Sequence, residues 1–162
     1  MDIKVSDYDN FTAILNNLEC LLPDGIAFIP KNIEIAKGKG DLVYSSEVKT
    51  LRKLFLKNGI TVEKIENKEE IQLFLHEHSA SWLAPTIFIG LSLLSENPNA
   101  ISIALNVLSN YLTEIFKGQP HTSKFKIDII VEKEKGRVYK RVTIEGEPTS
   151  FEEVAKLIRE IK

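Results

Sequence analysis

The N-terminal half of the chain alternates strand patterns with helix patterns. Apolar residues recur at helical spacing in residues 11–22 and 48–55, whereas the segments between them either alternate apolar with polar residues or are short apolar runs. The strands expected there are residues 2–6, 26–29, 33–35, 42–44 and 60–65. We expect the second and third of these to form a hairpin through Pro30. Residues 42–65 read as a βαβ-type unit, whose strands would be parallel if they share one sheet.

The middle of the chain is nearly free of charge. Residues 81–113 contain one acidic or basic side chain, Glu96. Apolar coverage predicts two helical arms, Trp82–Leu94 and Ala100–Phe116, and Pro98 lies between them, where it cannot continue the first helix. The prediction is therefore a central apolar αα-hairpin.

The apolar surface of this 81–116 hairpin has three physical destinations: the core of the same chain, another protein chain, or a bilayer. We favour the core. A bilayer would be reached only conditionally, after the hairpin leaves its resting site, because each arm is shorter than the roughly 20 residues that span a membrane. If the hairpin contacts protein, the expected interaction surface comprises Trp82, Phe88, Leu91, Leu105, Leu108, Tyr111 and Leu112.

The C-terminal part predicts a ββα unit. Apolar and charged residues alternate over 125–145 on either side of a turn at 133–136, which is typical of an antiparallel hairpin with one apolar face. Ser150 and Glu153 have the spacing of a capping box, and an apolar stripe over 151–161 predicts the final helix.

These elements predict an α+β fold with a mixed sheet. We expect one domain over residues 1–162, since this length is usual for a single domain. Its parts are β-α and βαβ-type units in residues 1–80, the central apolar αα-hairpin in 81–116, and the ββα unit in 124–162.

Charge and cysteine content narrow the function classes. Lys and Arg number 21 against 23 Asp and Glu, and both signs are spread along the chain, so charge gives no support to nucleic acid as the main partner. The one cysteine, Cys20, lies on an expected helix among leucines, which favours a buried hydrophobic role over a reactive one. The N-terminus has no secretory pattern, so we expect a cytoplasmic protein.

Two histidines invite a metal interpretation. A further helix is expected from Asn67 through Leu75, and it ends at His76 and His78. On a helix these two side chains point about 200° apart, whereas a helical zinc site needs both on one face, so they are weak metal candidates. A small metal-dependent hydrolase using them stays an alternative. Its further groups would be one or more of Glu66, Glu70 and Glu77, and His121 could complete the site only if the fold brings it near.

One glycine-rich loop has flanking cations. Successive backbone N–H groups in Lys37-Gly38-Lys39-Gly40 could cradle an anion. The segment lacks the spacing of a phosphate loop, so a surface turn is the favoured interpretation and an anion-binding loop the alternative.

The chain shows no nucleophile elbow and no dinucleotide fingerprint, and we expect no cofactor. We therefore favour a non-catalytic protein-interaction domain that works by binding a partner or by self-association, with a conditional membrane-inserting effector as an alternative. The order of elements in residues 83–162 and the corner Ile144-Glu145-Gly146-Glu147-Pro148 resemble the small effector-associated adaptor proteins of bacterial conflict and defence operons. The resemblance implies an adaptor in a bacterial, antiviral system with no catalytic residues.

Overall fold

The computed structural model describes residues 2–66, 72–75, 82–83, 85–117, 125–146 and 152–160. The helices are α1 (Phe11–Asn17), α2 (Glu47–Lys57), α3 (Leu91–Glu96), α4 (Pro98–Phe116) and α5 (Glu152–Glu160), with a short 3-10 helix, η1, at Lys39–Asp41. The strands are β1 (Asp2–Asp7), β2 (Ile26–Ile29), β3 (Val43–Ser45), β4 (Val62–Glu63), β5 (Leu73–Leu75), β6 (Trp82–Leu83), β7 (Thr86–Ile89), β8 (Phe125–Glu134) and β9 (Val138–Gly146).

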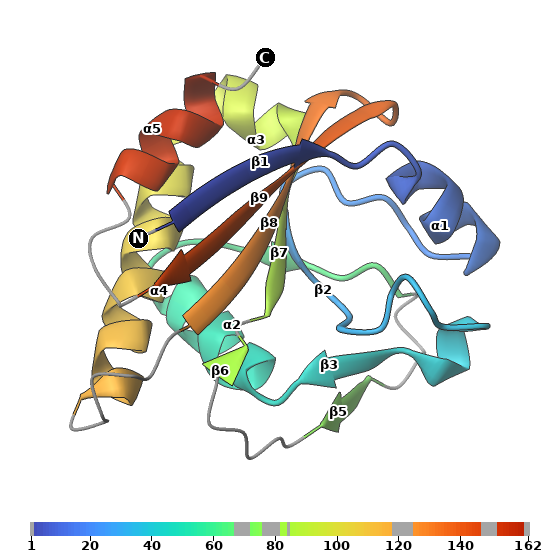
Figure 1. The fold of residues 1–162 in the computed structure, drawn as a ribbon, viewed down its shortest axis with the longest axis horizontal. Helices are drawn as coiled ribbons and strands as arrows, with labels where there is room; N and C mark the ends of the chain where they lie inside the picture. The colour runs from blue at the N-terminus through green and yellow to red at the C-terminus, as the bar shows by residue number, and fades with distance from the viewer. Residues whose placement is uncertain are drawn as a thin grey trace.

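A mixed sheet in the order β1-β9-β8-β7-β2-β4 forms the centre of the fold, and β6 also pairs with β8. The β8–β9 hairpin and the β1–β9 and β2–β7 pairs are antiparallel, whereas β7 is parallel to β8 and β2 is parallel to β4. β3 and β5 form a separate parallel pair. Helices lie on both sides of the main sheet, with α4 and α5 on one side and α1 on the other (Figure 1). This arrangement confirms the predicted α+β class and the mixed sheet.

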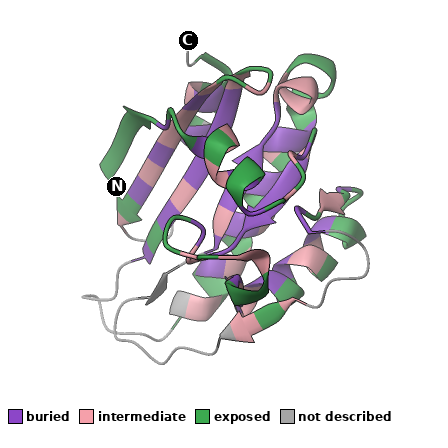
Figure 2. Cartoon of the chain, turned by 90° about the vertical axis from the view of Figure 1, so that its right-hand side faces the viewer, coloured by how far each residue is buried: buried purple, intermediate pink, exposed green. Residues whose placement is uncertain are grey.

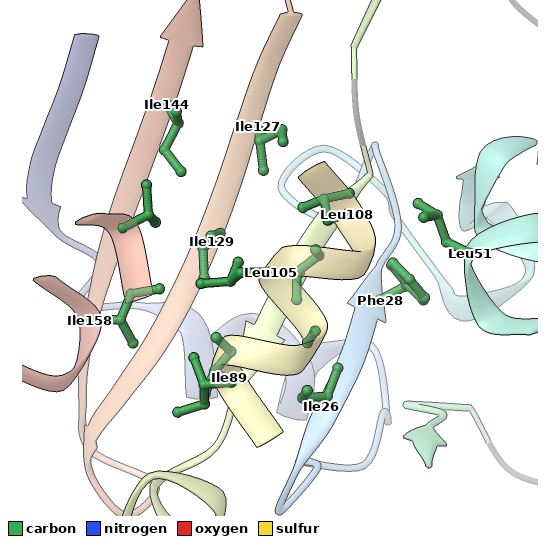
Figure 3. Close-up of a cluster of buried hydrophobic side chains, with 14 of the residues drawn as sticks. Ile26, Phe28, Leu51, Ile89, Leu105, Leu108, Ile127, Ile129, Ile144 and Ile158 are labelled. Carbon is green, nitrogen blue, oxygen red and sulfur yellow. The ribbon is translucent and has the colours of Figure 1, made fainter. Parts of the chain in front are cut away.

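The face of the sheet that packs against α2, α4 and α5 carries the larger core. Alternate residues of β8 and β9 point to it, because side chains alternate between the two faces of a strand. They pack with residues of α2, α4 and α5, and Figure 3 shows these aliphatic side chains meeting between the sheet and the helices. The labelled members are Ile26, Phe28, Leu51, Ile89, Leu105, Leu108, Ile127, Ile129, Ile144 and Ile158.

The opposite face carries a smaller, more aromatic core around α1. Phe11 stacks on Phe88 of β7 with ring centroids 5.4 Å apart and meets Tyr139 of β9 edge-on at 5.1 Å. The Oγ1 atom of Thr12 lies 2.6 Å from the Tyr139 hydroxyl and donates to the Gly136 carbonyl at 2.8 Å, so α1 is attached to the β8–β9 turn. The helix ends sooner than the apolar spacing predicts, because Glu19 adopts a positive φ of 56°.

The predicted αα-hairpin is wrong in its first arm. Residues 82–83 and 86–89 are strands, and only Leu91–Glu96 is helical before α4. Ile87, Phe88 and Ile89 of β7 are buried between β2 and β8, so the segment is apolar on both faces without being a helix. The second arm is confirmed. It begins at Pro98 rather than Ala100, since proline is well suited to the first turn of a helix.

Three further expectations change in the structure. Residues 33–35 are turns rather than the second strand of a hairpin, and β2 pairs instead with β7. The two strands of the expected βαβ-type unit lie in different sheets, since β3 pairs with β5 while β4 pairs in parallel with β2. Leu73–Leu75 is a strand where a helix was expected. The capping residue Ser150 lies outside the described residues, whereas the β8–β9 hairpin and α5 are confirmed.

Gly90 permits the sharp passage from β7 into α3. Its backbone N–H donates to the Gly25 carbonyl at 2.8 Å, and a Cβ atom at this position would overlap the carbonyl oxygen of Asp24. No other residue type leaves room for this backbone approach.

Within the described residues, none of the helices has the length and hydropathy needed to cross a membrane. The segment considered for membrane insertion includes β7, which is hydrogen-bonded to both β2 and β8. Its release would therefore break two strand pairings of the central sheet.

Candidate functional site

Two adjoining hollows lie on the α1 side of the sheet, where the strands carry polar residues. The first has a volume of about 280 Å³ and extends over Asp128, Ile130 and Arg141 beneath the loop of residues 30–35. The second, of about 420 Å³, lies at the end of β1 and is bounded by residues 7–10, Ile14 of α1 and the same loop. Tyr8, Glu34 and Arg141 line both hollows, so this triad is the centre of the candidate site.

The triad comes from three separate segments and is held by direct bonds. The Tyr8 hydroxyl donates to Glu34 Oε1 at 2.9 Å, and Arg141 Nη2 donates to the same carboxylate. The Arg141 guanidinium also lies 4.2 Å from the centre of the Tyr8 ring, within the range of a cation–π contact. Arg141 comes from β9, Tyr8 follows β1, and Glu34 belongs to the loop, so these bonds attach the loop to the sheet.

These contacts set the protonation states of the triad. Burial, and then the bond to Glu34, raises the pKa of Tyr8, so its hydroxyl stays protonated and acts as a donor. The hydrogen bond from Arg141 is the main cause of the lowered pKa of Glu34, so that carboxylate is ionised at neutral pH. Burial lowers the pKa of Arg141, but the bond to Glu34 and the negative charges around the guanidinium together exceed this effect and raise that pKa. These directions move each of the three pKa values further from pH 7.

Two neighbouring carboxylates, Asp128 and Asp7, are also paired. Asp128 accepts a 2.7 Å hydrogen bond from Thr143, its cross-strand neighbour, and Lys140 pairs with Asp7 at the end of β1. Ile35, by contrast, lies on the rim of the first hollow with 80% of its surface exposed. The site therefore presents an apolar side chain above a set of fixed charges.

A second polar cluster is buried between β3 and α2. The Tyr44 hydroxyl donates to Glu66 Oε1, Gln72 Nε2 donates to Glu66 Oε2 at 3.0 Å, and Arg52 Nη1 donates to Gln72 Oε1 at 2.7 Å. Burial, followed by the bond to Glu66, raises the pKa of Tyr44. The Nε and Nη2 atoms of Arg52 are buried and have no hydrogen-bond partner among the described residues, and burial lowers the pKa of Arg52. This cluster holds β3, α2 and residue 72 together, and Glu66 is committed to it.

Glu132 is a buried carboxylate with a structural role. It is 2% exposed and accepts hydrogen bonds of 2.9 Å from the backbone N–H groups of Leu91 and Gly136. The first satisfies a backbone donor at the start of α3, which has no intrahelical partner, and the second closes the β8–β9 turn. The carboxyl group can be buried here because each of its oxygen atoms accepts a hydrogen bond.

The residues predicted as an interaction surface are mostly in the core. Phe88, Leu105, Leu108 and Leu112 are buried, so the folded chain does not offer them to a partner. Leu91 and Tyr111 are partly exposed, and Tyr111 donates to Glu47 Oε2 at 2.6 Å across the space between α4 and α2. The side chain of Trp82 lies outside the described residues.

None of the described residues that line the two hollows belongs to the Lys37–Gly40 loop. Within the described part of the chain, nothing would lie within 4 Å of a Cβ atom at Gly38 or Gly40, and Lys39 forms a 3.6 Å ion pair with Glu19. Cys20 follows α1 instead of lying on it and is partly buried beside the smaller core.

The metal candidates fall outside what the structure covers. His76, His78, His121, Glu70 and Glu77 are all among the residues that are not described. In the described part of the chain, no group of three or more His, Cys, Asp or Glu side chains is arranged to hold a metal ion.

Comparison of the chain with protein-family models, with curated proteins and with solved structures gave no match. The function of the candidate site is therefore inferred from its geometry alone.

Sequence reasoning missed the triad. Its members lie at positions 8, 34 and 141, and nothing in linear spacing connects them. The one available signal was Glu34 itself, since a carboxylate between Ile33 and Ile35 in an expected strand needs either solvent or a partner.

Proposed function

We propose that this protein is a non-catalytic binding domain that recognises another protein through the surface around the two hollows. The observation that carries the proposal is Ile35, a large apolar side chain that is 80% exposed on a loop held in place by the bonds of Glu34 to Tyr8 and Arg141. An apolar side chain presented in a fixed position loses little conformational entropy on binding and is a typical anchor of a protein interface.

The chemistry of the site supports binding rather than turnover. The ionisable groups of the triad are engaged with one another, and their shifted pKa values keep each in one protonation state at neutral pH. The rim residues Glu34, Asp7 and Asp9 are exposed, which is typical of a surface that meets another surface and less so of an enclosed small-molecule site. The resemblance of residues 83–162 to defence-operon adaptor proteins is consistent with this role and implies a bacterial system.

The test is replacement of the anchor. Ile35→Asp places a charge on the rim without touching the core, so we expect the folded stability to stay within about 0.5 kcal/mol of wild type. Capture from cells of the source organism, followed by calorimetric titration of the purified partner, should show one stoichiometric complex with wild-type protein. The Ile35→Asp variant should weaken that complex at least tenfold, since buried apolar anchors contribute about 2 kcal/mol or more.

Leu56→Asp is the matched control. Leu56 is 68% exposed but lies on α2, away from the hollows, so its replacement should leave the complex unchanged. Equal weakening by both variants, or a complex that neither affects, would contradict the proposed surface.

A further inference from the structure

One edge of the central sheet is open along a regular strand. β1 is the outermost described strand beside β9, and all six of its residues, Asp2–Asp7, are exposed (Figure 2). Its pairing with β9 runs from Asp2 opposite Glu145 to Asp7 opposite Lys140 without a bulge. Every second residue of such an edge directs its backbone N–H and C=O outward, where another strand can bond to them.

The two faces of β1 have different chemistry. Ile3 lies opposite Ile144, and Val5 lies opposite Val142. Both β9 residues are fully buried in the core to which α5 contributes, yet Ile3 and Val5 keep 36% and 43% of their surface exposed. The helices on this face therefore bury the side chains of β9 but leave those of Ile3 and Val5 on β1 partly exposed.

The other face of β1 carries Lys4, with Asp2 two residues along the strand on the same side. Lys4 lies opposite Thr143 and has no ion-pair partner within the described part of the chain. A strand added beside β1 would place a side chain opposite or diagonal to Lys4, where an acidic residue is favourable and a basic one is not.

We infer that β1 accepts an extended segment of a partner protein as an added strand, and that this segment carries an acidic residue between two apolar residues. The apolar pair covers Ile3 and Val5, and the acidic side chain meets Lys4 on the opposite face. The inference rests on the proposed function and gives the partner segment a defined chemistry. β1 leads directly into Asp7 and Tyr8 of the second hollow, so the two surfaces are continuous.

A second copy of the chain fits this edge less well. Antiparallel self-pairing must keep the two faces of β1 apart, because directly opposed residues share a face. Two registers then pair five residues of β1 with themselves, residues 2–6 or residues 3–7. The first sets Lys4 against Lys4, and the second sets Ile3 against Asp7, so each of these contains a mismatched pair. A register centred on Ile3 sets Asp2 against Lys4, but it pairs only residues 2–4 of the strand.

The experiment uses two labelled peptides that differ in one residue. Both consist of three threonines, Val-Glu-Val or Val-Lys-Val, and three more threonines, and fluorescence anisotropy measures their binding to the wild-type protein and to Lys4→Glu. Lys4 is exposed, so this substitution leaves the fold intact. Wild type should bind the glutamate peptide roughly fivefold more tightly than the lysine peptide, and Lys4→Glu should reverse that order. Amide hydrogen exchange should slow in residues 2–7 when the peptide binds.

Three results overturn the inference. The first is the same ranking of the two peptides by both proteins, or binding of neither peptide. The second is slowed exchange confined to residues 30–36, which removes strand addition while leaving a protein-binding surface at the hollows. The third is a dimer in sedimentation with β1 already protected, which makes a second copy the occupant. Failure of the proposed function is recognised separately, because Ile35→Asp would then leave partner binding unchanged.

Discussion

The two faces of the central sheet use the same strands for different purposes. On the face covered by α4 and α5, Ile127 and Ile129 of β8 and Ile144 of β9 are fully buried. On the opposite face, the intervening positions of these strands carry Asp128 and Arg141, which line a hollow. The pleat of a single hairpin thus separates a surface that stabilises the fold from one that carries the proposed binding site.

The difference shows that the elements packed on each face determine which side chains that face can carry. Helices bury an apolar face completely, because their side chains interdigitate with those of the strands. α1 is short and leaves part of the other face to a loop, so polar strand residues there can pair with each other and with Glu34 instead of being forced into an apolar environment. Energetic tests of this contrast should therefore give large effects on the first face and smaller ones on the second.

The largest effect is expected in the helix-covered core. Leu108→Ala removes a fully buried side chain of α4 and leaves a cavity, so the free energy of unfolding should fall by about 3 kcal/mol. Ile103→Ala on the same helix is the control, because Ile103 is 43% exposed and should cost under about 1 kcal/mol. Chemical denaturation measures both, and similar losses would show that α4 does not seal this face.

An intermediate effect is expected at the buried carboxylate of β8. Glu132→Gln keeps the size of the side chain but replaces one acceptor oxygen with an NH₂ group, which would face one of the two backbone N–H donors now bound. The cost should be about 2 kcal/mol. Glu134→Gln is the control. Glu134 lies two residues further along β8, and its exposed side chain forms an ion pair with Arg137, so this substitution should change the free energy of unfolding by less than about 0.5 kcal/mol. A neutral outcome for Glu132→Gln would mean that the start of α3 does not need this acceptor.

The smallest effect is expected at the triad, and it depends on pH. The folded protein lowers the pKa of Glu34, mainly through Arg141, so the ionised carboxylate stabilises the fold above its ordinary pKa of 4.5. That contribution is lost as the pH falls through the lowered folded pKa. Because the side chain is 53% exposed, Glu34→Gln should cost less than about 1 kcal/mol at pH 7.

Stability curves of wild type and Glu34→Gln from pH 7 downward provide the measurement. The two proteins should converge at the acidic end, where the carboxylate is protonated in wild type. A gap that stays constant with pH would assign the effect to packing of the loop and not to the charge.

Elements with one solvent-exposed face and one buried face could be predicted from the sequence. α2, β9 and α5 carry the period of their secondary structure, because one side of each is more exposed to water than the other. Where that boundary is absent, the pattern was misread. β7 is buried on both faces, and its continuous apolar run cannot be told from a buried helix by periodicity alone.

The local sequence pattern also did not predict which strands pair with each other. The crossover that was expected to join residues 42–44 with 60–65 instead relates β2 to β4, and β3 takes β5 as its partner. Strand lengths of two to four residues for β2, β3 and β4 contain too little sequence to specify a neighbour. The surrounding helices decide it by covering one arrangement of apolar faces.

The amino-acid sequence by itself determined the class of the fold and the apolar sides of its amphipathic elements. An element with one side in water and the other in protein has apolar residues at the period of its own secondary structure, and that pattern can be read locally. Only the tertiary structure decided that residues 86–89 form an inner strand and that Tyr8, Glu34 and Arg141 meet above two hollows. Arg141 is more than a hundred residues from Tyr8 and Glu34 in the chain, so the triad forms only once the sheet has brought β1 beside β9. Its bonds depend on distance in space and leave no regular spacing in the sequence.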